Sequence, residues 1–399
     1  MTRDLDLLRG LSPEARLLLL AAGPTSTDAE VTTLLAANPI VWSELLALAE
    51  RERATGVLWR RLRAQATPTP TLSDELRASF ERVAMIADFT AGYLEQRIGE
   101  TMAALQARGV DALLLKGAAL AASVYRSFAE RPMGDVDLVV PGGQAEEAFQ
   151  IFQTVGWRWD SAEFPRERYR GHHHFPPLLD GRGMDARLEL HTELFVEGSP
   201  FALDAAQLFR AGREVTIGKG RAIIPSPEHL LLHTCIHYTW SHMMLFGAWR
   251  AFRDVMALSD AGIDWDKFLA DAERHRAASS CFWTLRLSER LAGATLPAEV
   301  MRRLQRSTSP RLISICERHA AREMFPSPDR CPSQWLRRRL WELSIRPEAS
   351  GHGTARPWLL DDMAPENVNP DRRQVGMVRA ARHLPRLGAW ARYARALIG

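Results

Sequence analysis

The sequence predicts an α+β protein in which a small mixed sheet with helices is flanked by helical regions on both sides. Apolar residues recur at helical spacing up to about residue 105. Short apolar runs bounded by turn residues then follow to residue 224, and a helix-start signal at Ser226 opens a second helical stretch. We therefore expect four segments: an N-terminal helical region over 1–105, an α/β core over 106–224, a C-terminal helical domain over 225–345, and a Pro/Gly-rich loop with a basic amphipathic helix over 346–399.

The N-terminal region carries the helical pattern in two stretches. Apolar residues lie three and four positions apart from Val41 to Leu48 and again from Val83 to Ile98. The alternating prolines of residues 67–71 cannot continue a helix, so they mark a loop between the two stretches.

The central region alternates strand and helix patterns. The apolar run at 111–115 suits a strand that is buried on both faces, and 135–140 suits a second one. We expect the remaining elements of this region to be helices at 118–127 and 144–154 and strands at 187–191, 215–217 and 222–224. From Pro225 onward the chain is helical again, because Ser226-Pro227-Glu228 combines a serine cap, a first-turn proline and an early acid.

Composition argues against several classes of protein. A chain of 399 residues is long enough for two or three domains, and its net charge of +3 gives no global field for nucleic acid or a membrane. The four cysteines are scattered without a C-x-x-C pair, which argues against a disulfide framework or a thiolate zinc site. The apolar stretch 17–22 is too short to span a bilayer, so we expect a cytoplasmic protein without a transmembrane segment.

Asp135 and Asp137 are the first candidate functional residues. Residues two apart in a strand point to the same face, so the two carboxylates should lie close together. They could be solvated acids at a surface strand edge. The apolar run 138–140 that follows them indicates a buried strand instead, where unpaired charges are costly, and a divalent cation would relieve their repulsion.

Lys116-Gly117 lies at the end of the preceding strand and the start of a helix. Such a turn lets backbone N–H groups face a phosphate, the glycine allows close approach, and the lysine adds a point charge. The simpler interpretation is a helix start with a lysine that reaches solvent. The order and spacing of this pair relative to Asp135 and Asp137 favour a phosphate site.

Glu189 is a candidate third carboxylate. The segment Arg187–His191 alternates polar and apolar residues, as a half-buried strand does, and places Arg187, Glu189 and His191 on one face. On a strand beside Asp137, Glu189 would complete a set of three acids for metal ions. An ordinary amphipathic strand would show the same pattern.

These motifs together carry a family resemblance. The Lys116-Gly117 pair followed by the run from Arg131 through Pro-Met-Gly to Asp135 and Asp137 resembles the uncharacterised bacterial nucleotidyltransferase family of the DNA polymerase β-like superfamily. The motifs 188–191 and 225–231 are also similar to that family, so the resemblance covers about residues 85–270. It implies a polymerase β-like core, dependence on Mg²⁺ or alternatively Mn²⁺, and transfer of a nucleoside monophosphate from an NTP with release of pyrophosphate.

The resemblance also implies roles for individual residues. Gly117 matches the phosphate-loop glycine, Asp135 and Asp137 match the metal ligands, and Glu189 falls at the position of the third acid. Arg131 belongs to the same run, where a phosphate-binding role and a structural role both fit. The sequence departs from the superfamily at Ala118, where serine is common, so no side-chain hydroxyl is available there for the phosphates.

Two further patterns are weaker. His172-His173-His174 could line a nucleotide or acceptor pocket, but its polar, glycine-flanked setting favours a solvated loop. His229, His233 and His237 recur every four residues and could bind zinc, although a helix packed on the core with one or two histidines facing the active site fits the surrounding apolar residues better.

Two arginine-containing segments complete the sequence. We expect Arg253-Asp254 to lie at the junction between domains. The arginine-rich tail over 372–395 could contact RNA or a membrane, and it also fits an amphipathic helix packed on the body of the protein.

The expected function is therefore Mg²⁺-dependent transfer of an NMP from an NTP to a hydroxyl or phosphate of a small molecule, peptide or glycan. We expect Asp135, Asp137 and Glu189 to be the catalytic metal ligands, and Lys116, Gly117, Arg131 and His191 to bind the nucleotide. Two alternatives stay open. One is transfer of the NMP to RNA, and the other is a non-catalytic nucleotide-binding module, against which the complete set of three acids argues.

Overall fold

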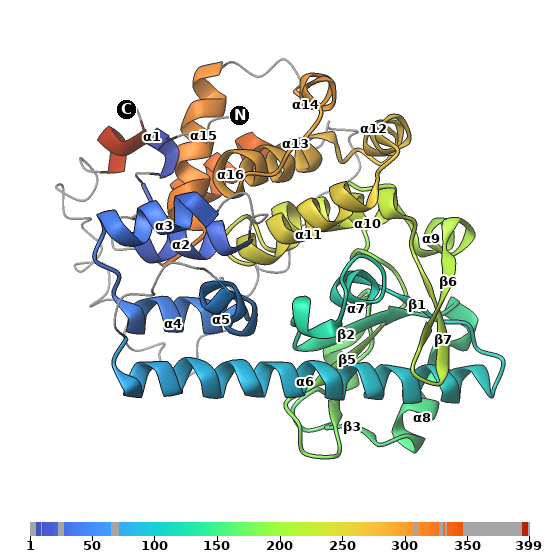
Figure 1. The fold of residues 1–399 in the computed structure, drawn as a ribbon. Helices are drawn as coiled ribbons and strands as arrows, with labels where there is room; N and C mark the ends of the chain where they lie inside the picture. Colours follow the sequence, from blue (N-terminus) through green and yellow to red (C-terminus); the bar gives the residue numbers. More distant parts are fainter. Residues whose placement is uncertain are drawn as a thin grey trace, which may run out of the picture.

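The computed structural model describes residues 5–8, 10–22, 28–64, 72–305, 310–326, 330–331, 333–345 and 393–397. Within this part of the chain the fold is a mixed α+β arrangement around one sheet of seven strands. Helices precede the sheet in the sequence and follow it (Figure 1). None of the described helices has both the length and the apolar character that crossing a membrane requires.

Six helices precede the sheet in the described residues: α1 (Leu5–Leu8), α2 (Pro13–Ala22), α3 (Asp28–Ala37), α4 (Trp42–Arg51), α5 (Thr55–Ala64) and α6 (Asp74–Gln106). Both stretches that show helical spacing in the sequence are helices, in α4 and α6. The long helix α6 begins at a serine cap, where the side chain of Ser73 accepts a hydrogen bond from the backbone N–H of Leu76. The loop predicted over 67–71 lies outside the described residues.

The seven strands are β1 (Leu113–Leu114), β2 (Asp135–Val139), β3 (Trp157–Trp159), β4 (Leu178–Asp180), β5 (Arg187–His191), β6 (Arg213–Ile217) and β7 (Gly220–Ile224). Their order across the sheet is β3-β4-β5-β2-β1-β7-β6. The pairs β2–β5 and β1–β7 are parallel, and the other neighbours are antiparallel. The five predicted strands are present, whereas β3 and β4 were not predicted.

Two predicted elements differ in extent. The strand expected over 111–115 is limited to β1, and the helix expected over 118–127 is α7, which spans Lys116–Ala121 and is therefore shorter and earlier. Beyond the end of this helix, the Tyr125 hydroxyl donates a 2.7 Å hydrogen bond to Asp254 Oδ1 of a later helix, a long-range contact that is compatible with the early end. The helix expected over 144–154 is α8 (Ala145–Thr154).

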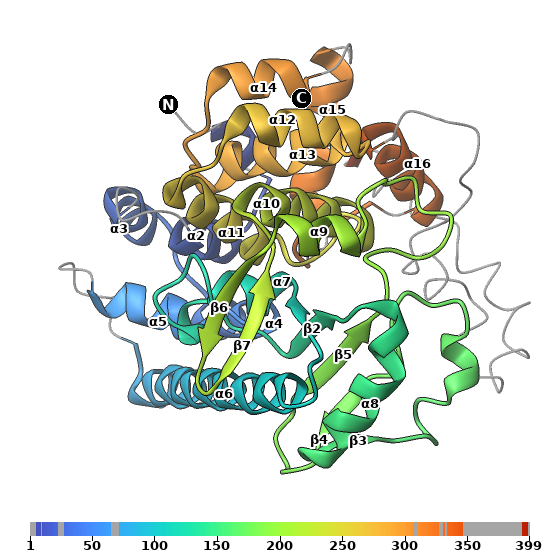
Figure 2. The same ribbon diagram turned by 90° about the vertical axis from the view of Figure 1, so that its right-hand side faces the viewer.

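Helix α6 covers one side of the sheet and contacts the β6–β7 hairpin closely. Gly99 in α6 lies so near the strand end that a Cβ atom there would stand 2.6 Å from the carbonyl oxygen of Ile217. Figure 1 and Figure 2 show α6 on one side of the sheet and the later helices α10 (Pro227–Ile236) and α11 (Ala248–Ala261) on the other. The sheet is thus held between early and late parts of the chain.

The remaining described helices are α9 (Ala205–Ala211), α12 (Trp265–Arg274), α13 (Ala278–Leu287), α14 (Ala298–Leu304), α15 (Pro310–Glu323) and α16 (Gln334–Ile345), with a π-helical turn at His237–Ser241. The predicted start of α10 is confirmed, because the Ser226 side chain caps it and Pro227 stands in its first turn.

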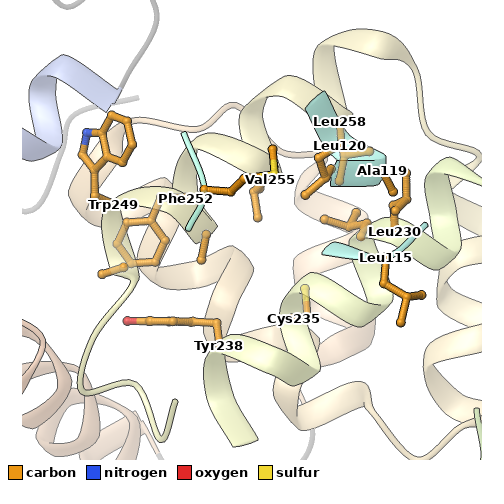
Figure 3. Close-up of a cluster of buried hydrophobic side chains, with 14 of the residues drawn as sticks. Leu115, Ala119, Leu120, Leu230, Cys235, Tyr238, Trp249, Phe252, Val255 and Leu258 are labelled. Carbon is orange, nitrogen blue, oxygen red and sulfur yellow. The ribbon is translucent and has the colours of Figure 1, made fainter. Parts of the chain in front are cut away.

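Apolar side chains join α7 to α10 and α11 (Figure 3). Leu115, Ala119 and Leu120 lie beside Leu230 of α10 and beside Val255 and Leu258 of α11, and all six are buried. This cluster fixes the start of α7, and with it Lys116 and Gly117, relative to the late helices.

The C-terminal tail is described only over 393–397, which is helical. Tyr393 and Leu397 are buried there against Cys331 and Leu340. These five residues agree with a helix packed on the body of the protein. The loop predicted over 346–372 and the rest of the arginine-rich tail lie outside the described residues.

Candidate active site

Strands β2 and β5 bring the predicted acids together. They pair in parallel with Asp135 opposite Arg187, Asp137 opposite Glu189 and Val139 opposite His191. Since alternate residues share a face in both strands, Asp135, Asp137, Glu189 and His191 lie on the same face. All four line one cavity.

Asp137 is the most enclosed of the acids, with 3% of its surface exposed. The Lys116 ammonium lies 2.7 Å from Asp137 Oδ1, and His191 Nε2 lies 2.9 Å from the same oxygen. His191 Nε2 is also 3.7 Å from Glu189 Oε2. Potential ligand atoms of Asp137, Glu189 and His191 all lie within 4.8 Å of one another, so these three residues fit a metal ion, and Asp135 lines the cavity next to them.

The surroundings shift the pKa values of the two aspartates in opposite directions. Burial acts to raise the pKa of Asp137, but the Lys116 charge and the His191 hydrogen bond outweigh it and hold that pKa well below its usual value. Desolvation, and then the negative charge of Asp137, raise the pKa of Asp135 although its side chain is open to the cavity. A cation placed between the two carboxylates would remove this repulsion.

Glu189 is an ionised, partly accessible carboxylate, with 24% of its side chain exposed. Burial acts to raise its pKa, but the contact with His191 and the Lys116 charge outweigh burial and lower it. Conversely, burial acts to lower the pKa of His191, and the contacts with Asp137 and Glu189 raise it.

The cavity has a volume of about 680 Å³, which is within the usual range for sites that bind small molecules. Three parts of the chain form its walls. Arg53 comes from the segment just before α5, and the acids come from the sheet. His237 and Arg250 come from the late helices. Lys116 and Gly117 line it as well.

Arg131 lines the cavity, but its contacts are structural. Its Nε donates to Asp254 Oδ1 at 2.6 Å and its Nη2 to Asp254 Oδ2 at 2.9 Å, while Nη1 donates to the carbonyl oxygen of Pro132 at 3.1 Å. Tyr125 donates to the same aspartate, and Arg253 lies over the Tyr125 ring at 5.4 Å. Arg253 and Asp254 therefore join α11 to the segment between α7 and β2.

Gly117 is buried beside Arg131 and Met133. A Cβ atom at this position would meet Met133 Cβ at 3.3 Å and Arg131 Nη1 at 3.4 Å. The absence of a side chain at Gly117 therefore allows the Arg131 segment to pack against the start of α7.

Two arginines of the cavity wall were missed by sequence reasoning. Arg53 has a positive φ of 57°, and its guanidinium packs on Gly134 so closely that any Cβ at residue 134 would overlap it. Arg250 lies at the start of α11, and its charge acts on Asp135. Neither arginine has a local motif, because Arg53 is distant in sequence from the acids and Arg250 lies in an ordinary amphipathic helix.

The solvated-loop interpretation of residues 172–174 is wrong. His172, His173 and His174 are only partly exposed and line the cavity. The His173 and His174 rings lie 5.2 Å and 5.3 Å from the His191 ring. Burial lowers the pKa of His173 to about 2 and that of His174 to about 4, so the rings are neutral near pH 7. Sequence reasoning placed the loop between the acids but could not show that it folds back over β5.

His229, His233 and His237 do not lie together at one site. His233 and His237 line the cavity, in agreement with the expectation that one or two would face the site, whereas His229 lies near Asp271 and His275. Burial lowers the pKa of His233 to about 3. Of the ten histidines that the structure describes, seven line the cavity: His172, His173, His174, His191, His233, His237 and His242.

Comparison with known proteins finds a matching family. The sequence model of a family described as "Uncharacterised nucleotidyltransferase" matches residues 38–293. This range contains Arg53, all seven strands and α6 to α13, and therefore every residue of the site described above. No curated protein matches the chain.

Proposed function

Because the chain belongs to the uncharacterised nucleotidyltransferase family, we propose that it transfers an NMP from an NTP to a hydroxyl or phosphate group of a small-molecule, peptide or glycan acceptor, with release of pyrophosphate. The sheet supports a core of the DNA polymerase β type, since the two aspartates of β2 stand beside a third acid on its parallel neighbour β5.

The observation that carries the proposal is the register of β2 and β5. It sets Asp137 directly opposite Glu189, with Asp135 two residues earlier on the same face. We propose that Asp135, Asp137 and Glu189 hold Mg²⁺, or alternatively Mn²⁺, with His191 supporting Asp137. A bound ion would neutralise charge on the phosphates and lower the pKa of an acceptor hydroxyl.

Cationic side chains provide the binding site for the triphosphate. Among the lining cations, Arg131 is held by Asp254 and Lys116 by Asp137. Arg53 and Arg250 stand near Asp135, where burial and then the Arg131 charge lower the pKa of Arg250. We assign Arg53 and Arg250 to the phosphates, and Lys116 to the phosphates once Asp137 has another cation beside it.

In the proposed reaction an acceptor oxygen forms a bond to the α-phosphorus while the bond from that phosphorus to the β-phosphate oxygen breaks, and pyrophosphate leaves in line. A hydroxyl acceptor loses its proton to Glu189, which is ionised and partly open to the cavity. The neutral histidines of the loop 172–174 and of α10 surround the remaining volume, where they can accept or donate hydrogen bonds to the nucleoside or the acceptor.

Calorimetric titration with each of the four NTPs tests the proposal. Wild type should bind one NTP in the presence of Mg²⁺, and Asp135→Ala and Asp137→Ala should lose that binding while their circular dichroism stays native. Asp185→Ala, which removes an exposed acid just before β5, is the matched control and should bind like wild type. If wild type binds none of the four NTPs with Mg²⁺ or Mn²⁺, the mechanism above is wrong.

RNA is a second candidate acceptor because of the tail. Seven arginines and no acid lie between residues 372 and 395. If the tail delivers RNA to the site, RNA binding should weaken steeply with salt, by roughly one logarithmic unit of affinity per logarithmic unit of salt for each phosphate contacted. Equal binding by a chain truncated after residue 371 would exclude this acceptor route.

A further inference from the structure

A second group of ligand-type side chains lies away from the cavity. His229 stands in the first turn of α10, Asp271 near the end of α12, and His275 directly after α12. All three are buried, with 6%, 4% and 2% of their surfaces exposed. Potential ligand atoms of the three residues lie within 4.8 Å of one another, and none of the three lines the active-site cavity.

The polar atoms of this group are left without partners. Within the described residues, His229 Nδ1, Asp271 Oδ2 and His275 Nδ1 are buried and have no hydrogen-bond partner. Buried polar atoms are normally paired, because removing them from water without a partner is unfavourable. Asp271 Oδ2 and His275 Nδ1 therefore lack a partner in the protein, and His229 turns its other ring nitrogen, Nε2, toward Asp271.

The arrangement of Asp271 suits a metal ion. Its Oδ1 is 3.2 Å from Arg274 Nη1, which leaves Oδ2 on the side of the histidines. Asp271 Oδ2 is 3.6 Å from His229 Nε2, which is too long for a hydrogen bond. It is close to the separation of roughly 3.3 Å between two ligand atoms in tetrahedral zinc coordination.

We propose that His229, Asp271 and His275 form a binding site for a transition-metal ion of the Zn²⁺ class. Two imidazoles and one carboxylate are typical zinc ligands, whereas Mg²⁺ prefers oxygen ligands alone. Asp271 and His275 are separated by four residues, so they share one side of the α12 end. Three protein ligands leave the fourth tetrahedral position for a water molecule.

The site would link three parts of the fold. The ion joins α10 to α12, and through the hydrogen bond from the Ala202 backbone N–H to the His275 carbonyl oxygen it also fixes the segment that leads into α9. Helix α10 carries His233 and the following turn carries His237, both of which line the active-site cavity. The ion therefore holds the wall that carries these two histidines, outside the reaction itself.

Metal content tests the proposal. Full-length protein freed of metal by chelation should take up about one equivalent of Zn²⁺, and the thermal midpoint should fall when Zn²⁺ is removed. Asp271→Asn and His275→Gln should weaken Zn²⁺ binding by roughly 100-fold or more, since even outer-shell changes cost 10–100-fold. Glu273→Gln, an exposed change between the two ligands on the same helix, is the matched control.

A second variant tests whether the Zn²⁺ ion is bound in the active-site cavity instead. The variant Asp137→Asn/Glu189→Gln should keep the Zn²⁺ equivalent and the chelator-sensitive thermal midpoint. Loss of Zn²⁺ in that variant, with retention in Asp271→Asn, would assign the ion to the cavity and overturn the proposal.

Cobalt spectroscopy keeps the proposal testable if a ligand variant fails to fold. His229→Cys replaces one ligand by another, so its Co²⁺ complex should show a thiolate-to-metal charge-transfer band that wild type lacks. An unchanged Co²⁺ spectrum, or wild type that binds neither Zn²⁺ nor Co²⁺, would show that the three residues are only a buried polar cluster.

Discussion

Lys116 occupies the position beside Asp137 that a metal ion would need. Its ammonium lies 2.7 Å from Asp137 Oδ1, and its backbone adopts a φ of +46°, which is uncommon for a residue with a side chain. The unusual backbone aims the lysine at the carboxylate. In the absence of nucleotide, Lys116 and a divalent cation should therefore compete for Asp137.

Lys116→Met tests this competition. We expect Mn²⁺ to bind the variant more tightly in the absence of nucleotide, by roughly tenfold, since a hydrogen bond to a charged group contributes about 1.5–3 kcal/mol. NMP transfer should nevertheless fall, because the triphosphate loses a cation. Electron paramagnetic resonance of free Mn²⁺ measures the binding, and Lys219→Met in the exposed β6–β7 turn is the control. Weaker Mn²⁺ binding by Lys116→Met would contradict the competition.

At the scale of single residues, sequence reasoning worked where the signal is local. The alternation of side chains within β2 and within β5 is enough to place Asp135, Asp137 and Glu189 on common faces. Arg53 and Arg250 could not be found this way, because their approach to Asp135 depends on how distant helices pack. The contact of Arg131 with Asp254, which lies 123 residues away, was likewise beyond the reach of local sequence.

At the scale of one element, Gly92 and Gly99 of α6 allow two glycine-to-alanine changes to be compared within the same helix. Glycine inside a helix normally costs about 0.5–1 kcal/mol relative to alanine. Gly92→Ala should therefore raise the free energy of unfolding by about that amount, since a Cβ atom there would meet nothing within 4 Å. Gly99→Ala should lower it, because its Cβ atom would stand 2.6 Å from the Ile217 carbonyl oxygen.

Urea denaturation of the two variants measures the difference, and both changes occur in the same helix with the same chemistry. A gain of stability in Gly99→Ala would mean that the β6–β7 hairpin can move away from α6.

The elements that sequence reasoning missed are the short ones. Strands β3 and β4 have three residues each, which is too few for an alternating pattern to stand out, and they exist because they extend the sheet from β5. The alanine-rich helix ends before Tyr125, which contacts Asp254 instead, and local sequence cannot reveal such a contact. Long or capped elements such as α6 and α10 carry their own signals and were predicted.

The Arg131–Asp254 pair connects the sheet region to the late helices, so it should contribute to the stability of the whole molecule. Both side chains are buried, with 8% and 2% of their surfaces exposed. Removing one partner of a buried pair leaves an uncompensated charge, so Asp254→Ala should lower the free energy of unfolding by about 3–5 kcal/mol. The exposed pair Arg221–Glu214 is the control, since Glu214→Ala should cost at most about 1 kcal/mol.

Equilibrium urea unfolding gives both values, and the double variant Arg131→Met/Asp254→Leu should recover part of the loss. If Arg131 instead served the phosphates, Arg131→Met would weaken NTP binding without changing stability.

Buried histidines should make the protein unstable in mild acid. Burial lowers the pKa of His173 to about 2, of His174 to about 4, and of His233 and His242 to about 3. The unfolded chain has histidine pKa values of about 6.5, so below that pH it binds more protons than the folded protein. Stability is therefore lost as the pH falls through about 6.5 toward the folded values, by about 1 kcal/mol per pH unit for each histidine.

Together these four histidines would lower the free energy of unfolding by several kcal/mol between about pH 6.5 and pH 5. That is a large part of the free energy of unfolding of about 5–15 kcal/mol that is usual for proteins. His191, whose pKa is raised, acts in the opposite direction, but it is one residue against these four and against others whose pKa burial also lowers, such as His237 and His319. Asp137 does not contribute in this range, because the stability that follows from its lowered pKa is lost only below about pH 4. Urea midpoints at several pH values between 7.5 and 5 should therefore fall steadily, and His233→Gln should reduce the slope. A flat profile would mean that the cavity admits protonated histidines, and hence that its wall opens to water without unfolding.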